Sequence, residues 1–410
     1  MNPTPSPRIS SAEVILATAA NADDCLLTVL SAGDERCQCL LFSAGAETET
    51  ARTVLPISGD FTSFVSAAAL DRGFVVFGED PHAEPRLHAF VIDGGTGAVV
   101  DNWTIPCGDY PSVIQVFACR GGFAAIWHEL SPTGPMADMW VAVVDTAEGT
   151  QTRTVIAHDV DWGSSAERWV GGPTVFGGIG SRVLDSNGSA ALTTCVWTVD
   201  LRGGGCEVHE CRIPERQDGL VDHPAILTID RSGTSRLSWI EREQDSTSVI
   251  VTADVDLERS RCGDVHRSDG VEINPTIIEA FDVDGQRICV LGGHEQSDRC
   301  IAQTYVFAAD RLIEGSAPPI RCDQGLRVIC LATGRPLMVW NDGLTIRSAD
   351  WGPGEWMDAR EHAAFTDHAG FEPVPLRSGW ALVAMPPQAD PDAAQPLRPT
   401  VTWIGRGRPG

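Results

Sequence analysis

Lysine is absent from this chain, and tyrosine is rare. All 30 basic residues are arginine, and only 2 residues are tyrosine. The lack of lysine excludes Schiff-base chemistry on a lysine amine and also excludes a lysine general base. Together with frequent Ala, Gly and Arg, it is typical of codon usage in a GC-rich genome and indicates a bacterial protein.

Positive charge is also scarce. The chain has 56 acidic residues against 30 basic ones, and its formal net charge is -26. Such an acidic surface repels nucleic acid and anionic membranes, so we expect neither as a partner. No apolar run approaches the roughly 20 residues that a membrane helix needs. The N-terminal region has no basic segment before a long apolar core, and residues 14–20 fit a first strand better than a signal peptide.

No two cysteines have the Cys-x-x-Cys spacing that is typical of metal or redox sites. The 13 cysteines are odd in number. Several, such as Cys195, Cys289 and Cys330, lie within apolar runs, where a free cysteine behaves as a small core hydrophobe. These features indicate a reduced, cytoplasmic protein. No nucleotide, flavin or haem signature is visible, so we expect no cofactor.

A segment of about fifty residues recurs along the chain, a period typical of stacked supersecondary units. Four copies are easy to see, and they begin at Phe61, Tyr110, His223 and Asn274. In each, a short apolar strand follows a polar or Pro-containing corner, and a turn leads to a second apolar run that ends in charged residues. The first strands of all the copies start near residues 12, 62, 111, 171, 223, 275, 326 and 372.

Each copy has room for four short antiparallel strands. In the copy near residue 223 we predict strands at residues 225–229, 236–240, 248–255 and 263–267. This unit resembles a blade of the β-propeller superfamily, and the resemblance covers nearly the whole chain. The WD dipeptide and the kelch double glycine are absent, so the resemblance is to the architecture and indicates no specific family. It implies an all-β propeller of four-stranded antiparallel blades.

The number of blades has two interpretations. Eight blades are favoured, and seven are the alternative because the copies near residues 12, 171 and 326 match weakly. The last copy is one strand short. Residues 5–10 are predicted to supply that outer strand and close the ring, which would remove exposed sheet edges. Residues 1–410 would then form a single domain.

The propeller resemblance implies where a site would lie. In propellers, the loops that enter the first strand and the loops that link the second and third strands share one face. Aligned in this way, that face is rich in histidine and carboxylate side chains. The candidate catalytic residues are Tyr110, His128, Glu129, His223, Glu241, Arg242, His294 and Glu295.

Paired histidines and carboxylates can take and return protons near neutral pH. We predict His223 or Tyr110 as the general acid or base, Glu241 or His128 as its partner, and Arg242 as a group that orients an anion. This favours a small-molecule enzyme with non-redox acid–base chemistry in the central funnel, such as a lyase, isomerase, cyclase or hydrolase.

Two other functions stay open. The first is a non-catalytic binding or scaffolding propeller, although loop residues that differ from copy to copy favour a single specialised pocket. The second is a metalloenzyme in which four histidines converge on one ion, as in the iron centre of carotenoid-cleaving propellers. Its ligands would be His128, His223, His294 and His368, without any His-x-His or His-x-x-x-His spacing to support them. The sequence indicates neither the substrate nor the oligomeric state.

Overall fold

The computed structural model is built from strands. Its described residues form 32 strands, with no helix among them. Within them, no helix exists that could reach across a membrane. The described residues are 14–31, 36–58, 65–80, 86–132, 136–160, 175–186, 189–200, 206–212, 220–221, 226–229, 235–242, 248–256, 259, 261–271, 274–283, 286–294, 300–308, 311–312, 320–321, 324–342, 345–352, 354–357, 359–364, 370–385 and 398–405.

The first half of the chain forms antiparallel meanders, in which each strand is hydrogen-bonded to the next strand along the chain. The first two meanders are β1 (Ile15–Ala20), β2 (Leu26–Ser31), β3 (Cys37–Phe42) and β4 (Ala51–Leu55), then β5 (Ser66–Leu70), β6 (Gly73–Glu79), β7 (Leu87–Asp93) and β8 (Val99–Ile105). The next two are β9 (Ser112–Cys119), β10 (Gly122–Leu130), β11 (Ala137–Asp145) and β12 (Thr150–Val160), then β13 (Val175–Ser186), β14 (Ser189–Asp200) and β15 (Glu207–Arg212). A single residue pair, Val160 with Arg182, joins β12 to β13 and makes one seven-stranded sheet of the last two meanders.

The second half repeats this arrangement. Its first two sheets are β16 (Leu220–Val221), β17 (Ile226–Ile229), β18 (Ser235–Arg242), β19 (Ser248–Asp256) and β20 (Arg261–Val271), then β21 (Asn274–Val283), β22 (Gln286–His294), β23 (Cys300–Ala308), β24 (Arg311–Leu312) and β25 (Ile320–Arg321). The last two are β26 (Gln324–Cys330), β27 (Pro336–Asn341), β28 (Thr345–Asp350) and β29 (Arg360–Ala364), then β30 (Phe371–Pro375), β31 (Gly379–Ala384) and β32 (Thr400–Gly405). The four strands predicted for the copy near residue 223 are confirmed as β17 to β20.

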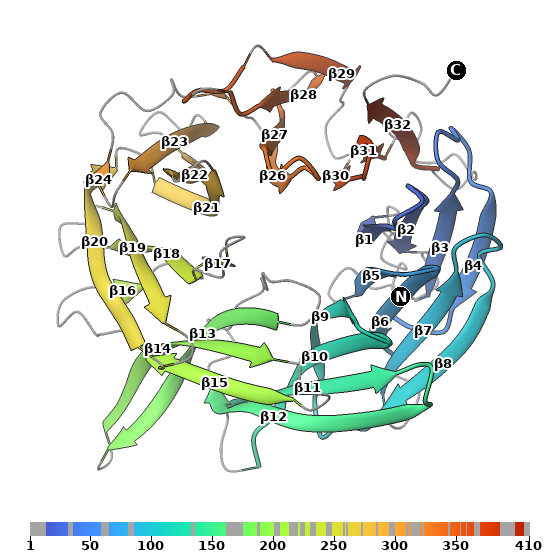
Figure 1. Cartoon of the computed structure of the whole chain (residues 1–410), viewed down its shortest axis with the longest axis horizontal. Helices are drawn as coiled ribbons and strands as arrows, with labels where there is room; N and C mark the ends of the chain where they lie inside the picture. The colour runs from blue at the N-terminus through green and yellow to red at the C-terminus, as the bar shows by residue number, and fades with distance from the viewer. Residues whose placement is uncertain are drawn as a thin grey trace, which may run out of the picture.

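The sheets follow one another around a ring, with strands such as β1, β5, β9, β17, β21 and β26 nearer the centre and β4, β8, β12, β20 and β29 nearer the outside (Figure 1). This is a β-propeller of antiparallel blades, as the repeat predicted. The choice between eight and seven blades stays a prediction.

The second strand of a blade is the most deeply buried because neighbouring blades cover both of its faces. Every residue of β2 is buried, and β6 is buried from Gly73 to Gly78. Such strands are continuous apolar runs, as expected for strands without a solvent face. The outer strand β4 instead alternates exposed and more buried positions, which is the pattern of a strand with one face in water.

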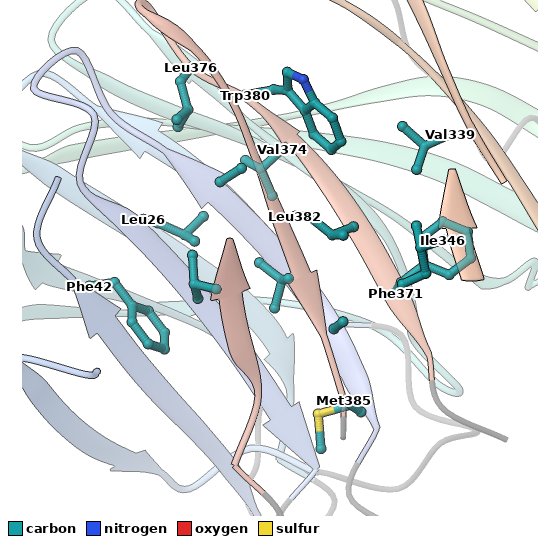
Figure 2. Packing of buried hydrophobic residues seen from close by; sticks show 14 of the residues in the cluster. Leu26, Phe42, Val339, Ile346, Phe371, Val374, Leu376, Trp380, Leu382 and Met385 are labelled. Carbon is teal, nitrogen blue, oxygen red and sulfur yellow. The ribbon is translucent and has the colours of Figure 1, made fainter. Parts of the chain in front are cut away.

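The first and last sheets pack against each other. Leu26 and Phe42 of the first sheet share a hydrophobic cluster with Trp380 and Leu382 of the last sheet (Figure 2). The Trp403 indole N–H also donates to the Ala46 carbonyl at 2.7 Å. The last sheet contains three strands among the described residues, and the predicted closing strand at residues 5–10 lies outside them.

Cysteine contributes to the packing as a free thiol. The structure describes 11 free cysteines. Burial raises the pKa of the Cys37 thiol to about 12 and that of the Cys119 thiol to about 11. Both thiols therefore stay protonated at neutral pH and behave as small hydrophobic side chains.

Candidate functional site

In an antiparallel meander, alternate strands start and end on the same side of the ring. The first and third strands of a blade begin on the side where the second and fourth strands end. We call this side face A and define it by the third blade, where β9 and β11 begin and β10 and β12 end. Rigid scaffolds commonly carry their functional groups on the loops at one such face.

Three of the predicted site residues lie at face A of the third blade. Tyr110 comes just before β9 and is 72% exposed, while His128 and Glu129 lie near the end of β10 and are buried. In other blades, Glu241 and Arg242 end β18 and His294 ends β22. The structure describes the Glu241 side chain, which is buried. His223, Glu295 and His368 lie outside the described residues.

The Glu129 carboxylate is held by an indole and a guanidinium. The Trp127 Nε1–H and the Arg153 Nη2–H both donate to its Oε1, each at 2.6 Å. The Arg153 guanidinium also lies 3.6 Å from the centre of the Trp140 ring, where its charge interacts with the π face. This buried carboxylate is therefore part of an ion pair inside the blade.

Glu241 has the same environment two repeats later. The Trp239 Nε1–H donates to its carboxylate at 3.1 Å, and Arg267 donates through Nε at 3.0 Å and through Nη2 at 3.2 Å. In both blades the tryptophan and the glutamate are on the second strand and the arginine is on the fourth. The structure thus places Glu129 and Glu241 in separate, equivalent clusters and does not bring them together.

This ion pair recurs in two more blades. An acidic residue two positions after an aromatic one, at the end of the second strand, contacts an arginine within the same blade. The four pairs are Glu79 with Arg86 at 3.6 Å, Glu129 with Arg153 at 2.6 Å, Glu241 with Arg267 at 3.0 Å, and Asp342 with Arg347 at 2.5 Å. The aromatic-x-acid spacing, repeated at Phe77, Trp127, Trp239 and Trp340, is the sequence signal that predicts this cluster. Roles for Glu129 and Glu241 in proton transfer stay a prediction, and their observed contacts stabilise the blade.

His128 differs from the glutamates because burial acts on it directly. Desolvation lowers the pKa of its imidazole from 6.5 to about 4, so the ring is neutral at neutral pH. Within the described residues, no three or more histidine, cysteine or acidic side chains are grouped to hold a metal ion.

A histidine and an aspartate that the sequence did not single out meet at the rim of the third blade. His158 Nδ1 lies 3.1 Å from Asp138 Oδ2, and the side chains are 55% and 5% exposed, respectively. The Asp159 backbone N–H donates to the other carboxylate oxygen of Asp138 at 3.2 Å. The Ser131 hydroxyl lies 3.3 Å from Asp159 Oδ1, so four polar residues from β10 to β12 form one connected group at face A.

The segment that carries Tyr110 is hydrogen-bonded to the end of β10. The Leu130 N–H donates to the Asp109 carbonyl at 3.0 Å. A Cβ added at Gly108 would lie 2.7 Å from Glu129 Oε2, so glycine allows the chain to pass close over that carboxylate. Tyr110 itself has φ of 52°, in the left-handed region that a residue with a side chain rarely adopts.

Comparison with solved structures shows which fold this is. The chain resembles the dihydro-heme d1 dehydrogenase NirN in complex with DHE (12% identity, TM-score 0.50, covering 83% of this chain and 66% of that one). It also resembles the Trypanosoma rangeli sialidase in complex with the inhibitor DANA (7%, TM-score 0.39, 74% and 56%) and the SapL1 lectin in complex with alpha methyl fucoside (10%, TM-score 0.37, 88% and 98%). At these identities the likeness shows the fold alone, and the chain is a β-propeller.

No family model matches this sequence, and no curated protein matches it. One fold can carry many unrelated functions, so the fold by itself assigns neither catalysis nor binding.

Proposed function

We propose that this propeller acts on a small molecule by non-redox acid–base chemistry, and that its site lies at face A of the third blade. The observation that carries the proposal is the position of unusual backbone. Three described residues other than glycine have positive φ, and two of them, Tyr110 and Asp159, lie at this one edge. Strained backbone of this kind is kept mainly where a binding or catalytic group must be held in place.

The groups at this edge suit proton exchange. The phenol of Tyr110 and the imidazole of His158 are both accessible to solvent. Tyr110 precedes the first strand and His158 lies on the fourth, and three strand spacings separate these strands by about 14 Å. A substrate that contacts both is therefore elongated, with Tyr110 holding one end and proton transfer taking place at the other. Arg242 ends β18 and His294 ends β22, so their backbone positions lie at face A of two other blades.

A second candidate is a binding propeller without turnover, and a different observation favours it. The carboxylates of Glu129 and Glu241, which sequence patterns predict as proton-transfer groups, are both paired with arginine. Both carboxylates are buried and hydrogen-bonded to that arginine within their blades, so neither is presented to a substrate.

A ligand screen separates the two candidates. A library of small metabolites is tested by saturation-transfer NMR against the wild-type protein, Tyr110→Ala and Tyr305→Phe, and each ligand is then incubated with the protein to detect conversion. Tyr305 is the matched control because it is the other tyrosine of the chain and lies on β23, within a hydrophobic cluster.

We expect ligands that Tyr110→Ala loses and Tyr305→Phe keeps, and we expect at least one to be converted. Binding without conversion would favour the second candidate. Ligands that bind Tyr110→Ala as well as wild type would show that the site lies elsewhere.

A further inference from the structure

The pair of Asp138 and His158 has the arrangement of an oriented base. The aspartate is almost completely buried, whereas more than half of the imidazole side chain is exposed. A buried carboxylate behind an accessible imidazole fixes the ring orientation and stabilises the positive charge that the ring acquires with a proton.

The hydrogen bonds determine which ring nitrogen carries the proton. Asp138 accepts the Asp159 backbone N–H at one oxygen and faces His158 Nδ1 with the other. An ionised carboxylate can only accept hydrogen bonds, so Nδ1 must be the N–H of the neutral ring. The lone pair is then on Nε2, at the far side of a solvent-accessible ring.

A β-bulge creates this contact. Ala137 pairs with Val160 and Met139 pairs with Ala157, so His158 and Asp159 together oppose the single residue Asp138. The extra residue takes φ of 56° at Asp159. Bulges change the direction of side chains and are frequent next to active sites, and here the bulge brings both the imidazole and a backbone N–H onto one carboxylate.

Two other histidines of the described structure lack this combination. His209 lies 3.7 Å from Glu207. The Glu207 side chain is mostly exposed, so it does not hold the imidazole in one orientation. His362 Nε2 lies 2.6 Å from the hydroxyl of Ser348, which is buried, and desolvation lowers the pKa of that imidazole. Neither histidine has a buried carboxylate behind an accessible ring nitrogen.

We propose that His158 is the general base of the face A site, with Asp138 as its positioning residue; this rests on the proposed function. His158 Nε2 removes a proton from a water molecule or a substrate hydroxyl as that oxygen attacks an electrophilic carbon. The imidazolium donates through Nδ1–H to Asp138, and the proton on Nε2 then passes to the leaving group or to solvent. The substrate class is thus one with an ester-type or similarly activated bond.

Hydrolysis of 4-nitrophenyl acetate tests the base without knowledge of the natural substrate. In this reaction water adds to the acetyl carbon, the bond to 4-nitrophenolate breaks, and acetate and protons are released. We compare the second-order rate constants of wild type, His158→Gln, Asp138→Asn and the control His209→Gln. General-base catalysis contributes at least about a hundredfold in evolved sites, and we expect losses of about tenfold or more for the first two variants with this poor substrate. The His209→Gln variant should keep the wild-type rate.

Equal rates for wild type and His158→Gln would overturn the proposal. His158 is on the surface, so that variant should fold even if Asp138→Asn does not. Histidine-selective 15N NMR supplies a second readout: at high pH, His158 should be the Nδ1–H tautomer, and an Nε2–H tautomer would also overturn the proposal. If the tautomer and the ester rates are as expected but the metabolite screen finds no substrate, His158 stands as a base and the proposed function fails. If a substrate is found and His158→Gln converts it at the wild-type rate, the function stands and this inference fails.

Discussion

The Asp24 carboxylate accepts a hydrogen bond from the Ser378 hydroxyl at 2.6 Å, across 354 positions of the sequence. Its other oxygen accepts the Arg377 backbone N–H at 2.7 Å. Asp24 lies in the turn between β1 and β2, and its partners lie in the turn between β30 and β31. These bonds join the first and last blades at the edge opposite to face A. Leu26 and Leu376, each two positions from Asp24 or Ser378, belong to the hydrophobic cluster in Figure 2.

Asp24→Ala should weaken the closure of the ring. It removes two charge-assisted hydrogen bonds at an exposed turn, and we expect a loss of about 1 to 2 kcal/mol in the free energy of unfolding, measured by urea denaturation. Asp24→Asn is the control, because asparagine keeps an acceptor and tolerates the φ of 57° at this position. Unchanged stability of the alanine variant would mean that the two turns are not coupled.

Glu241→Gln should destabilise the protein because it leaves Arg267 without its anionic partner. The glutamate is buried and the arginine is about one third exposed, so we expect a loss of about 2 kcal/mol, less than for a fully buried pair. Glu129→Gln should act in the same way on Arg153.

The control for these two variants is a pair at the surface. Arg259 contacts Asp256 at 3.3 Å with its side chain 77% exposed, and Arg259→Gln should cost about 0.5 kcal/mol or less. Thermal and urea denaturation measure all three variants. A cost for Glu241→Gln as small as that of the surface variant would contradict a structural role for the buried pairs.

His128 should make stability depend on pH. Burial lowers the pKa of the folded protein's imidazole to about 4, whereas the unfolded chain has the ordinary value of 6.5. Between these values the unfolded state binds a proton that the folded state does not, so stability is full above pH 6.5 and falls as the pH drops toward 4. The shift corresponds to about 3 kcal/mol.

Unfolding free energies measured from pH 7.5 to 4 test this effect. His128→Leu should flatten the dependence relative to wild type, while His209→Gln, at a partly exposed position, should keep the wild-type slope. Parallel curves for wild type and His128→Leu would contradict it.

Tyr110→Gly should be more stable than Tyr110→Ala by about 1 kcal/mol, because only glycine adopts positive φ without strain. Both variants remove an exposed ring, so the loss of contacts should be similar. Both should also lose ligands of the face A site. Equal stability of the two variants in denaturant titrations would show that the backbone at this position is not strained.

The blade strands could be predicted because their signals are local. Apolar runs of a few residues, separated by turns rich in Gly, Asp and Pro, were sufficient to predict residues 225–229 and 236–240, which the structure confirms as β17 and β18. A strand or a tight turn depends mainly on residues that are next to one another in the chain. The same local pattern recurs in each blade, so the sequence indicates the same strands and turns in blade after blade.

The partners of individual charges could not be predicted in this way. The second apolar run of each copy was expected to end in charged residues, as β10 and β18 do at Glu129 and Glu241. The contacts of these glutamates with Arg153 and Arg267, however, depend on which side of each strand the side chains point to. That is determined by the register between strands, and a shift of one residue exchanges the two faces. The expected convergence of histidines also depends on how the blades lie around the ring.

The sequence by itself determined the repeating architecture, the negative net charge and the absence of lysine chemistry. Only the tertiary structure decided that the buried glutamates pair with arginines and that Asp138 meets His158. That last contact arises from one extra residue in β12, at Asp159, where the backbone adopts positive φ. A bulge inserts one residue into the alternation of its strand, and its position depends on the pairing with β11, so packing between strands, rather than local preference, places the imidazole at face A.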